Sequence, residues 1–281
     1  MKKGISELSF PPGMSLEEIF EISQEAGFEG IELMVKEKGE LSIGSREETW
    51  EKVRNLSKKN NLEVMSLVSL LQWEYPLTSP HREVRDKSLD ITKRMIEMAP
   101  YLGVEKVLII PGMVSRGLKG EMISSYETTL NTLKEILKKL LPLAEKKGVT
   151  LCLENVWNKF LLSPLEFREL IDEFSHPLLK VYFDVGNVLL YGFPEDWIRI
   201  LGERIALVHV KDYRLDIGTS RGFVPLLQGD VNWREVVKAL KEIGYEGYLI
   251  AEIGPYRGYP LKSIWDTSSS MDYILSLEKE K

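Results

Sequence analysis

Four residues with metal-binding side chains each end a short apolar run in the second half of the chain. The runs cover residues 150–153, 181–183, 205–208 and 248–251, and the residues that follow them are Glu154, Asp184, His209 and Glu252. Three carboxylates brought together repel one another unless a cation lies among them. One imidazole with three carboxylates suits one divalent ion of intermediate hardness. We therefore predict a metal site with these four ligands, for Mn²⁺ or Co²⁺ first and Mg²⁺ or Zn²⁺ as alternatives.

A structural interpretation of the same four residues is also open. A polar residue at a strand end often faces solvent or the N-terminus of a helix, and for one residue alone this is the stronger interpretation. Four matching positions at consecutive strand ends favour the metal site. The four side chains can meet only if the fold brings the ends of their strands together.

The elements that must position these residues alternate along the chain as strand and helix. Several junctions share one form, a helix end, a glycine and then an apolar strand, and their glycines are Gly27, Gly103, Gly148 and Gly244. We count eight strand–helix units, from a first strand at residues 7–10 to a last helix from Asp266 to about Glu278. Eight units in 281 residues predict one domain over residues 1–281, folded as a single (β/α)₈ TIM barrel.

An open, doubly wound sheet is the alternative arrangement of alternating strands and helices. No glycine-rich phosphate loop follows the first strand, which argues against it. In a closed barrel, the C-terminal ends of the strands form the rim on which active sites lie. The four predicted ligands would then converge from strands five to eight.

Composition limits the partners and the compartment. The net charge of −6 argues against a nucleic-acid partner, because phosphate contacts usually require a basic surface. No apolar run approaches the roughly 20 residues of a membrane helix, so no membrane partner is expected. Cys152 is the only cysteine, which excludes an internal disulfide, and the N-terminus lacks the apolar region of a signal peptide. A cytoplasmic location is the expectation.

The motifs around the four charged residues resemble those of a known family. They are Leu153-Glu154-Asn155, Phe183-Asp184-Val185-Gly186-Asn187, Val208-His209-Val210-Lys211-Asp212 and Ala251-Glu252. They are similar to motifs of the xylose isomerase-like sugar phosphate isomerase/epimerase family, and most of all to its ketose 3-epimerases and L-ribulose or L-xylulose 5-phosphate 3-epimerases. The resemblance implies that the residues matching the four ligands bind one divalent metal. It also implies that the two glutamates, Glu154 and Glu252, are the catalytic acid/base pair.

The chemistry of C3 epimerisation agrees with this resemblance. Inverting a carbon beside a ketone requires that one proton be removed and another returned to the opposite face. A metal that chelates the carbonyl and the neighbouring hydroxyl stabilises the enediolate as a Lewis acid. Two carboxylates on opposite sides of the sugar, here Glu154 and Glu252, can serve as base and acid.

Four further residues are candidates for substrate binding: Asn187, Lys211, Arg214 and Trp157. Lys211 lies two residues past His209, on the same side of the strand, where it could contact a substrate oxygen or hold Glu252. Arg214 lies in a rim loop and could bind a phosphate bidentately. Trp157 is a candidate pocket wall, and Asn187 stands where some ketose epimerases carry a histidine that touches substrate. Lys211 and Arg214 could instead be solvated surface charges, and Trp157 could be a lid residue that packs on the barrel.

These observations predict a divalent-metal-dependent sugar or sugar-phosphate epimerase or isomerase, with C3 epimerisation of a ketose as the first choice. An aldose–ketose isomerase and a keto-inositol dehydratase could use the same residues. An abasic-site endonuclease shares the fold, but only three histidines and the acidic net charge argue against it. A non-catalytic binding protein would more plausibly have lost a ligand. The expected partner is a small-molecule sugar or sugar phosphate, and a homo-oligomer, dimer or tetramer, is left open.

Overall fold

A computed structural model describes residues 1–277. Eight parallel strands form a closed barrel in the order β1-β10-β7-β6-β5-β4-β3-β2. This confirms the predicted (β/α)₈ TIM barrel class. The barrel strands are β1 (Lys2–Ser6), β2 (Gly30–Met34), β3 (Glu63–Val68), β4 (Lys106–Ile109), β5 (Thr150–Glu154), β6 (Leu179–Asp184), β7 (Ile205–Val210) and β10 (Tyr248–Ala251).

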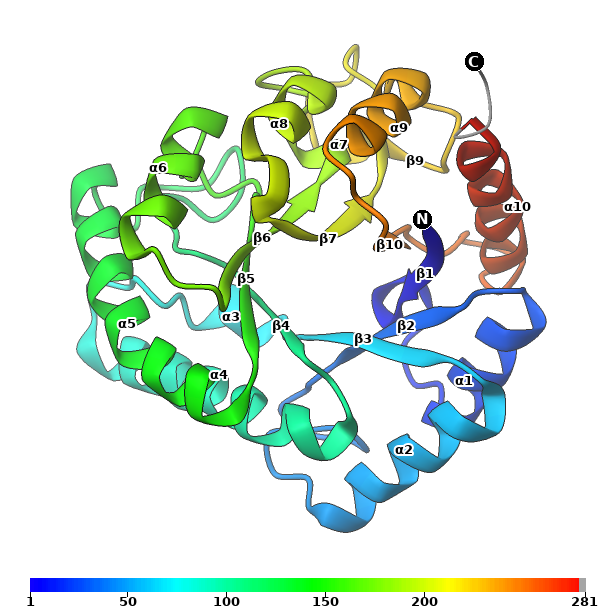
Figure 1. Cartoon of the computed structure of the whole chain (residues 1–281), viewed down its shortest axis with the longest axis horizontal. Coiled ribbons are helices and arrows are strands. Elements are labelled where there is room, and N and C mark those ends of the chain that lie inside the picture. Colours follow the sequence, from blue (N-terminus) through cyan, green and yellow to red (C-terminus); the bar gives the residue numbers. More distant parts are fainter. Residues whose placement is uncertain (278–281) are drawn as a thin grey trace. The chain divides into compact units, whose positions relative to one another are not determined.

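The helices follow the strands along the chain, and the elements of Figure 1 carry the same labels as the text. The α-helices are α1 (Leu16–Glu25), α2 (Glu47–Asn60), α3 (Leu71–Glu74), α4 (Arg82–Leu102), α5 (Tyr126–Lys147), α6 (Pro164–Phe174), α7 (Val185–Val188), α8 (Pro194–Leu201), α9 (Trp233–Glu242) and α10 (Lys262–Ser276). Short 3-10 helices are η1 (Glu7–Ser9), η2 (Gly202–Arg204) and η3 (Ser220–Gly222). Within residues 1–277, none of these helices has both the length and the apolar character needed to cross a bilayer.

The chain divides into two compact units. The first unit comprises Met1–Leu33, Asn55–Met65 and the residues from Tyr182 onward, and the second comprises Met34–Arg54 and Ser66–Val181. In the first unit, β1 pairs with β2 and β10, β10 pairs with β7, and α8 packs beside α9 (Figure 1). In the second unit, β4 pairs with β3 and β5 while α4 packs on α5. A single domain over residues 1–281 stays a prediction.

The predicted junctions between helix and strand are present, with glycine in the conformation that ends a helix. Gly103 and Gly148 follow α4 and α5 in the left-handed region, at φ 76° and 66°. This region is open to glycine without the steric penalty that a Cβ would bring. Gly27 and Gly244 also have positive φ. Each glycine turns the chain from the end of a helix into the next strand.

The first strand was predicted at residues 7–10, and this was wrong. β1 covers Lys2–Ser6, and Ser6 then caps the 3-10 helix Glu7–Ser9. The ammonium of Lys3 in this strand is buried and bonds the Ser268 hydroxyl and Asp272 on α10. The last helix, predicted from Asp266 to about Glu278, is α10, and Glu278 lies outside the described residues.

A small antiparallel sheet follows the end of β7. Its strands are β8 (Asp212–Tyr213) and β9 (Phe223–Val224). Asp212 holds the chain that follows this sheet, since its carboxylate accepts from the backbone of Val231 and from the indole N–H of Trp233. Gly229 is required beside it, because an added Cβ would lie 2.1 Å from Asp212 Oδ1. Asp212 is therefore a tether for the segment after β9.

Candidate functional site

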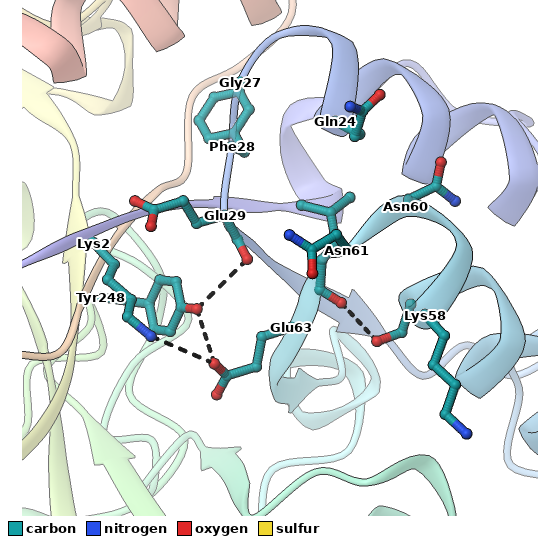
Figure 2. Close-up of a pocket in the computed structure, with 12 residues that line it drawn as sticks. Lys2, Gln24, Gly27, Phe28, Glu29, Lys58, Asn60, Asn61, Glu63 and Tyr248 are labelled. Atoms are coloured by element: carbon teal, nitrogen blue, oxygen red, sulfur yellow. Dashed lines mark hydrogen bonds and ion pairs between the residues drawn. The ribbon is translucent and has the colours of Figure 1, made fainter.

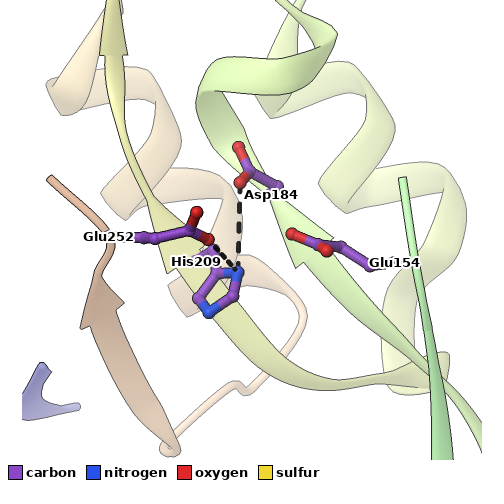
Figure 3. A group of neighbouring side chains, drawn as sticks. All are labelled: Glu154, Asp184, His209 and Glu252. Carbon is purple, nitrogen blue, oxygen red and sulfur yellow. Dashed lines mark ion pairs between the residues drawn. The ribbon is translucent and has the colours of Figure 1, made fainter. Parts of the chain in front are cut away.

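The four predicted ligands lie at the C-terminal ends of their strands. Glu154 ends β5, Asp184 ends β6, His209 is the penultimate residue of β7, and Glu252 directly follows β10. Each residue offers one ligand atom, and these atoms lie within 4.8 Å of one another (Figure 3). The cluster could hold a metal ion. The members of the cluster differ in exposure: His209 and Asp184 are fully buried, while the Glu252 side chain is 22% exposed.

Asp184 is oriented by the short helix that it starts. Its Oδ1 accepts from the backbone N–H of Asn187 at 2.8 Å and so caps α7. Gly186 in this turn lies directly against the residue that follows β7, since an added Cβ would come within 2.7 Å of Lys211 Cβ and 2.9 Å of its carbonyl oxygen. The close approach leaves Oδ2 of Asp184 directed at Lys211 and His209.

His209 divides its two ring nitrogens between two groups of partners. Nδ1 lies 3.2 Å from Glu252 Oε2 and 4.0 Å from Asp184 Oδ2. Nε2 lies 3.1 Å from Oε1 of Glu32, a residue of β2. A ring nitrogen beside two carboxylates favours a cation between them, and an imidazole with carboxylates is a common donor set for divalent ions. The observed donors therefore fit the predicted metal.

Glu32 was missed in the sequence, although it is fully buried in this cluster. Burial alone would raise the pKa of the Glu32 carboxyl, but the charge and hydrogen bond of His209 and the hydrogen bonds of Tyr182 and Ser6 lower the pKa from 4.5 to about 2. These interactions favour the carboxylate form of Glu32. The available signal was a charged residue in the middle of the apolar strand 30–35, because a buried charge requires partners.

Lys211 pairs with two members of the cluster. Its ammonium lies 3.0 Å from Asp184 Oδ2 and 3.1 Å from Glu252 Oε1, and its side chain is 14% exposed. The two alternatives for this residue were a substrate contact and a contact that holds Glu252. The structure contains the second contact, and the substrate contact stays a prediction.

A pocket of about 340 Å³ opens beside this end of the first unit. Its walls include Lys211, Glu252, Phe223 and Tyr256. The volume is at the lower end of the range of small-molecule sites, which runs from about 300 to 1,000 Å³. Partly exposed Glu252 therefore borders both the metal-binding group and a space large enough for a small ligand.

The other predicted substrate residues have different surroundings. Asn187 is buried one turn past Asp184, and Trp157 is buried three residues past Glu154. The Arg214 guanidinium is about half exposed and forms two hydrogen bonds to Asp216, with Nη2 at 2.7 Å. A phosphate-binding role for Arg214 would require that this pair open. The substrate-binding roles of these three residues stay predictions.

A second, larger pocket lies at the opposite ends of the strands of the first unit. It has a volume of about 560 Å³, and Figure 2 shows Lys2, Glu29, Glu63 and Tyr248 among the residues that line it. The Tyr248 hydroxyl bonds Glu63 at 2.9 Å, and Lys2 lies 4.0 Å from the same carboxylate. These groups neutralise one another at an open surface, and none of the predicted site residues lines this pocket.

Comparisons with known proteins agree on the fold. A sequence model of one known family, the xylose isomerase-like TIM barrel, matches residues 20–272. A relative from Haemophilus influenzae, named putative L-ribulose-5-phosphate 3-epimerase SgbU, is 24% identical, over 90% of this chain and 88% of that protein. The crystal structure of a D-tagatose 3-epimerase-like protein aligns with TM-score 0.81 and 22% identity, over 100% of this chain and 99% of that one. The structure of the IOLI protein with a bound zinc atom aligns with TM-score 0.79 and 17% identity, over 100% of both chains.

Proposed function

The chain belongs to the xylose isomerase-like TIM barrel family, and we propose that it is a divalent-metal-dependent epimerase or isomerase of a sugar or sugar phosphate, whose reaction is C3 epimerisation of a ketose. One observation carries the proposal: two glutamates, an aspartate and a histidine offer ligand atoms within 4.8 Å at the strand ends. The family membership confirms the resemblance seen in the motifs. The relative's name, an L-ribulose-5-phosphate 3-epimerase, and the ketose 3-epimerase likeness of the fold support the choice of reaction.

In this proposal, the donor set holds one divalent ion through Glu154, Asp184, His209 and Glu252. Mn²⁺ and Co²⁺ suit three carboxylates and one imidazole, and the zinc atom in the IOLI structure keeps Zn²⁺ among the candidates with Mg²⁺. When bound, the ion would supply Lewis-acid stabilisation of the negative charge that develops on the substrate's carbonyl oxygen.

The two glutamates are the proposed proton-transfer pair. One removes the proton from C3 and the other returns a proton to the opposite face. Glu252 is suited to this work because it borders the pocket of about 340 Å³ and remains 22% exposed. The ammonium of Lys211, 3.1 Å from Glu252 Oε1, fixes the direction of that carboxyl.

The substrate-binding roles of Asn187, Lys211, Arg214 and Trp157 are part of the same proposal. Phe223 and Tyr256 add aromatic faces to the pocket wall, on which the apolar face of a sugar ring can pack. A sugar phosphate would bring a dianion to the rim, and Arg214 would exchange Asp216 for that group. A cytoplasmic location and a single domain over residues 1–281 complete the proposal.

The decisive experiment follows hydrogen during turnover. The protein, loaded with Mn²⁺ or Co²⁺, is incubated in D₂O with a panel of ketoses and their 5-phosphates, and NMR records the products. Epimerisation by two carboxylates predicts deuterium at C3 together with the C3 epimer. A hydride-shift isomerase would instead give an aldose with hydrogen carried from C2 to C1, and a dehydratase would release water.

Metal removal is the second arm of this experiment. Dialysis against a chelator should abolish turnover, and added Mn²⁺ or Co²⁺ should restore it. Full turnover of protein that elemental analysis finds free of metal would contradict the proposal, as would hydrogen transfer from C2 to C1 without solvent exchange.

A further inference from the structure

The buried carboxylate of Glu32 has partners on both of its oxygens. Oε1 lies 2.7 Å from the Ser6 hydroxyl and 3.1 Å from His209 Nε2, and Oε2 lies 2.7 Å from the Tyr182 hydroxyl. Ser6 and Glu32 are register partners on β1 and β2, while Tyr182 and His209 belong to β6 and β7. The Glu32 side chain, from β2, thus contacts residues of β1, β6 and β7 through polar groups.

These contacts assign the proton on His209. An ionised carboxylate only accepts hydrogen bonds, so each of its three partners must donate. The hydroxyls of Ser6 and Tyr182 can rotate to do so, but Nε2 can donate only when it carries hydrogen. A histidine that binds a metal is the neutral imidazole with one N–H, so hydrogen on Nε2 leaves the Nδ1 lone pair for the ion. Nδ1 is the nitrogen that lies 3.2 Å from Glu252 Oε2, on the side of the proposed metal.

Tyr182 restricts the ring from a second direction. Its ring lies against the imidazole, with centroids 4.3 Å apart and planes inclined at 48°. The same tyrosine donates its hydroxyl to the other oxygen of Glu32. Rotation of the imidazole would therefore break its bond to Glu32 and disturb its contact with the Tyr182 ring.

We propose that Glu32 is a positioning residue, whose carboxylate keeps hydrogen on Nε2 of His209 and so presents the Nδ1 lone pair to a divalent ion. This inference rests on the proposed function, because it assumes that Nδ1 is a ligand. Glu32 does not touch the substrate in this scheme. It acts through His209, and a carboxylate in this position also makes the imidazole a stronger donor.

The test compares the metal affinity of four proteins by calorimetry with Mn²⁺ and Co²⁺: wild type, Glu32→Gln, Ser6→Ala and Glu63→Gln. Glu32→Gln keeps the shape of the side chain but removes its charge, and we expect affinity to fall about 10- to 100-fold. Ser6→Ala removes one hydrogen bond and keeps the charge, so a loss of about threefold is expected. Glu63→Gln, at the opposite strand ends, should bind like wild type.

Two further measurements separate positioning from a role in stability alone. The Tm of each metal-free variant is recorded, since a purely structural role would lower Tm and leave the affinity of the folded protein unchanged. NMR of ¹⁵N-histidine in metal-free wild type, recorded at a pH where the His209 ring is neutral, reports its tautomer. The spectrum of His209→Asn identifies its signals among the three histidines. Hydrogen on Nε2 is expected in wild type, and a mixture of tautomers in Glu32→Gln.

Folded Glu32→Gln that binds metal within about twofold of wild type would overturn the inference, as would hydrogen on Nδ1 in wild type. If Glu32→Gln does not fold, the inference is tested by the wild-type tautomer and by the metal affinity of Tyr182→Phe, which is expected to fall. Failure of the proposed function has a different signature, namely wild-type protein that binds neither ion while His209 still carries hydrogen on Nε2.

Discussion

Carboxylates and lysines lie at both ends of the strands in the first unit, but the two ends differ in how far these charges balance. At the N-terminal ends, Lys2 and Lys58 line an open pocket with Glu29 and Glu63, so the charges balance. At the C-terminal ends, Asp184 and Glu252 share the ammonium of Lys211, while Glu32 lies beside the His209 ring. The larger cavity, about 560 Å³, is at the balanced end.

The difference teaches that burial and charge imbalance, rather than cavity size, indicate where chemistry can occur. Exposed ion pairs contribute about 0–1 kcal/mol because water competes for both partners. Buried carboxylates with too few cations are unfavourable unless a further cation binds among them. The C-terminal end keeps that unfavourable arrangement, which is a reason to expect a divalent ion there. Four pairs of substitutions, matched between the two ends or with a surface control, can break or sharpen this comparison.

The largest effect is expected when a carboxylate is neutralised at each end. Glu252→Gln keeps the size of the side chain and one oxygen donor, but it removes a base, and kcat should fall by about 10²- to 10⁴-fold. Glu63→Gln should leave kcat within about twofold, because its partner Tyr248 is not part of the cluster. Steady-state kinetics on an active ketose measures both. Equal losses of kcat in the two variants would show that the two strand ends do not differ in their role in catalysis.

A smaller but clear loss is expected from His209→Asn. The amide offers a weaker ligand than the imidazole nitrogen, so the affinity for Mn²⁺ or Co²⁺ should fall tenfold or more, about 1.4 kcal/mol or more. His81→Asn is the control, because the His81 side chain is 72% exposed on the surface. Equilibrium dialysis with elemental analysis gives both affinities. Unchanged metal binding in His209→Asn would exclude this histidine as a ligand.

Replacing Lys211 in the cluster should raise the metal affinity rather than lower it. Lys211→Met removes the ammonium that lies near 3 Å from Asp184 and Glu252, so a divalent ion meets a more negative site. We expect metal affinity to rise about threefold to tenfold, or about 0.7–1.4 kcal/mol. Lys58→Met, in the pocket at the other end, should leave it unchanged. Calorimetry decides, and weaker binding in Lys211→Met would show that the lysine supports the metal site.

The smallest effect is expected at the N-terminal ends. Tyr248→Phe removes the hydroxyl that bonds Glu63 at 2.9 Å, which should lower the free energy of unfolding by about 0.5–1.5 kcal/mol. Metal affinity should not change. Tyr182→Phe is the matched substitution, since it removes a hydroxyl that bonds Glu32, and there a loss of metal affinity is expected. Urea unfolding measures the stability of both variants, and calorimetry measures their metal affinity. A change of metal affinity in Tyr248→Phe would contradict the predicted difference between the two tyrosines.

Much of the fold and the ligand set could be predicted because their signals are local. A helix end, a glycine and an apolar strand lie within ten residues of one another, and Gly103 and Gly148 adopt the left-handed conformation that such junctions need. Each of Glu154, Asp184, His209 and Glu252 ends a recognisable apolar run. In a parallel barrel the strand ends meet on one side, so local patterns were enough to predict that these four side chains converge.

The pairing of side chains from distant strands was decided by the tertiary structure alone. Glu32 and His209 are 177 residues apart in the chain, and no local pattern relates them. Likewise, the ammonium of Lys3 bonds Asp272 on α10, 269 residues away in the chain. Residue type and period predict which side of a strand a residue occupies. Which partner satisfies a buried charge depends on the packing of several strands at once, and only the folded chain contains that information.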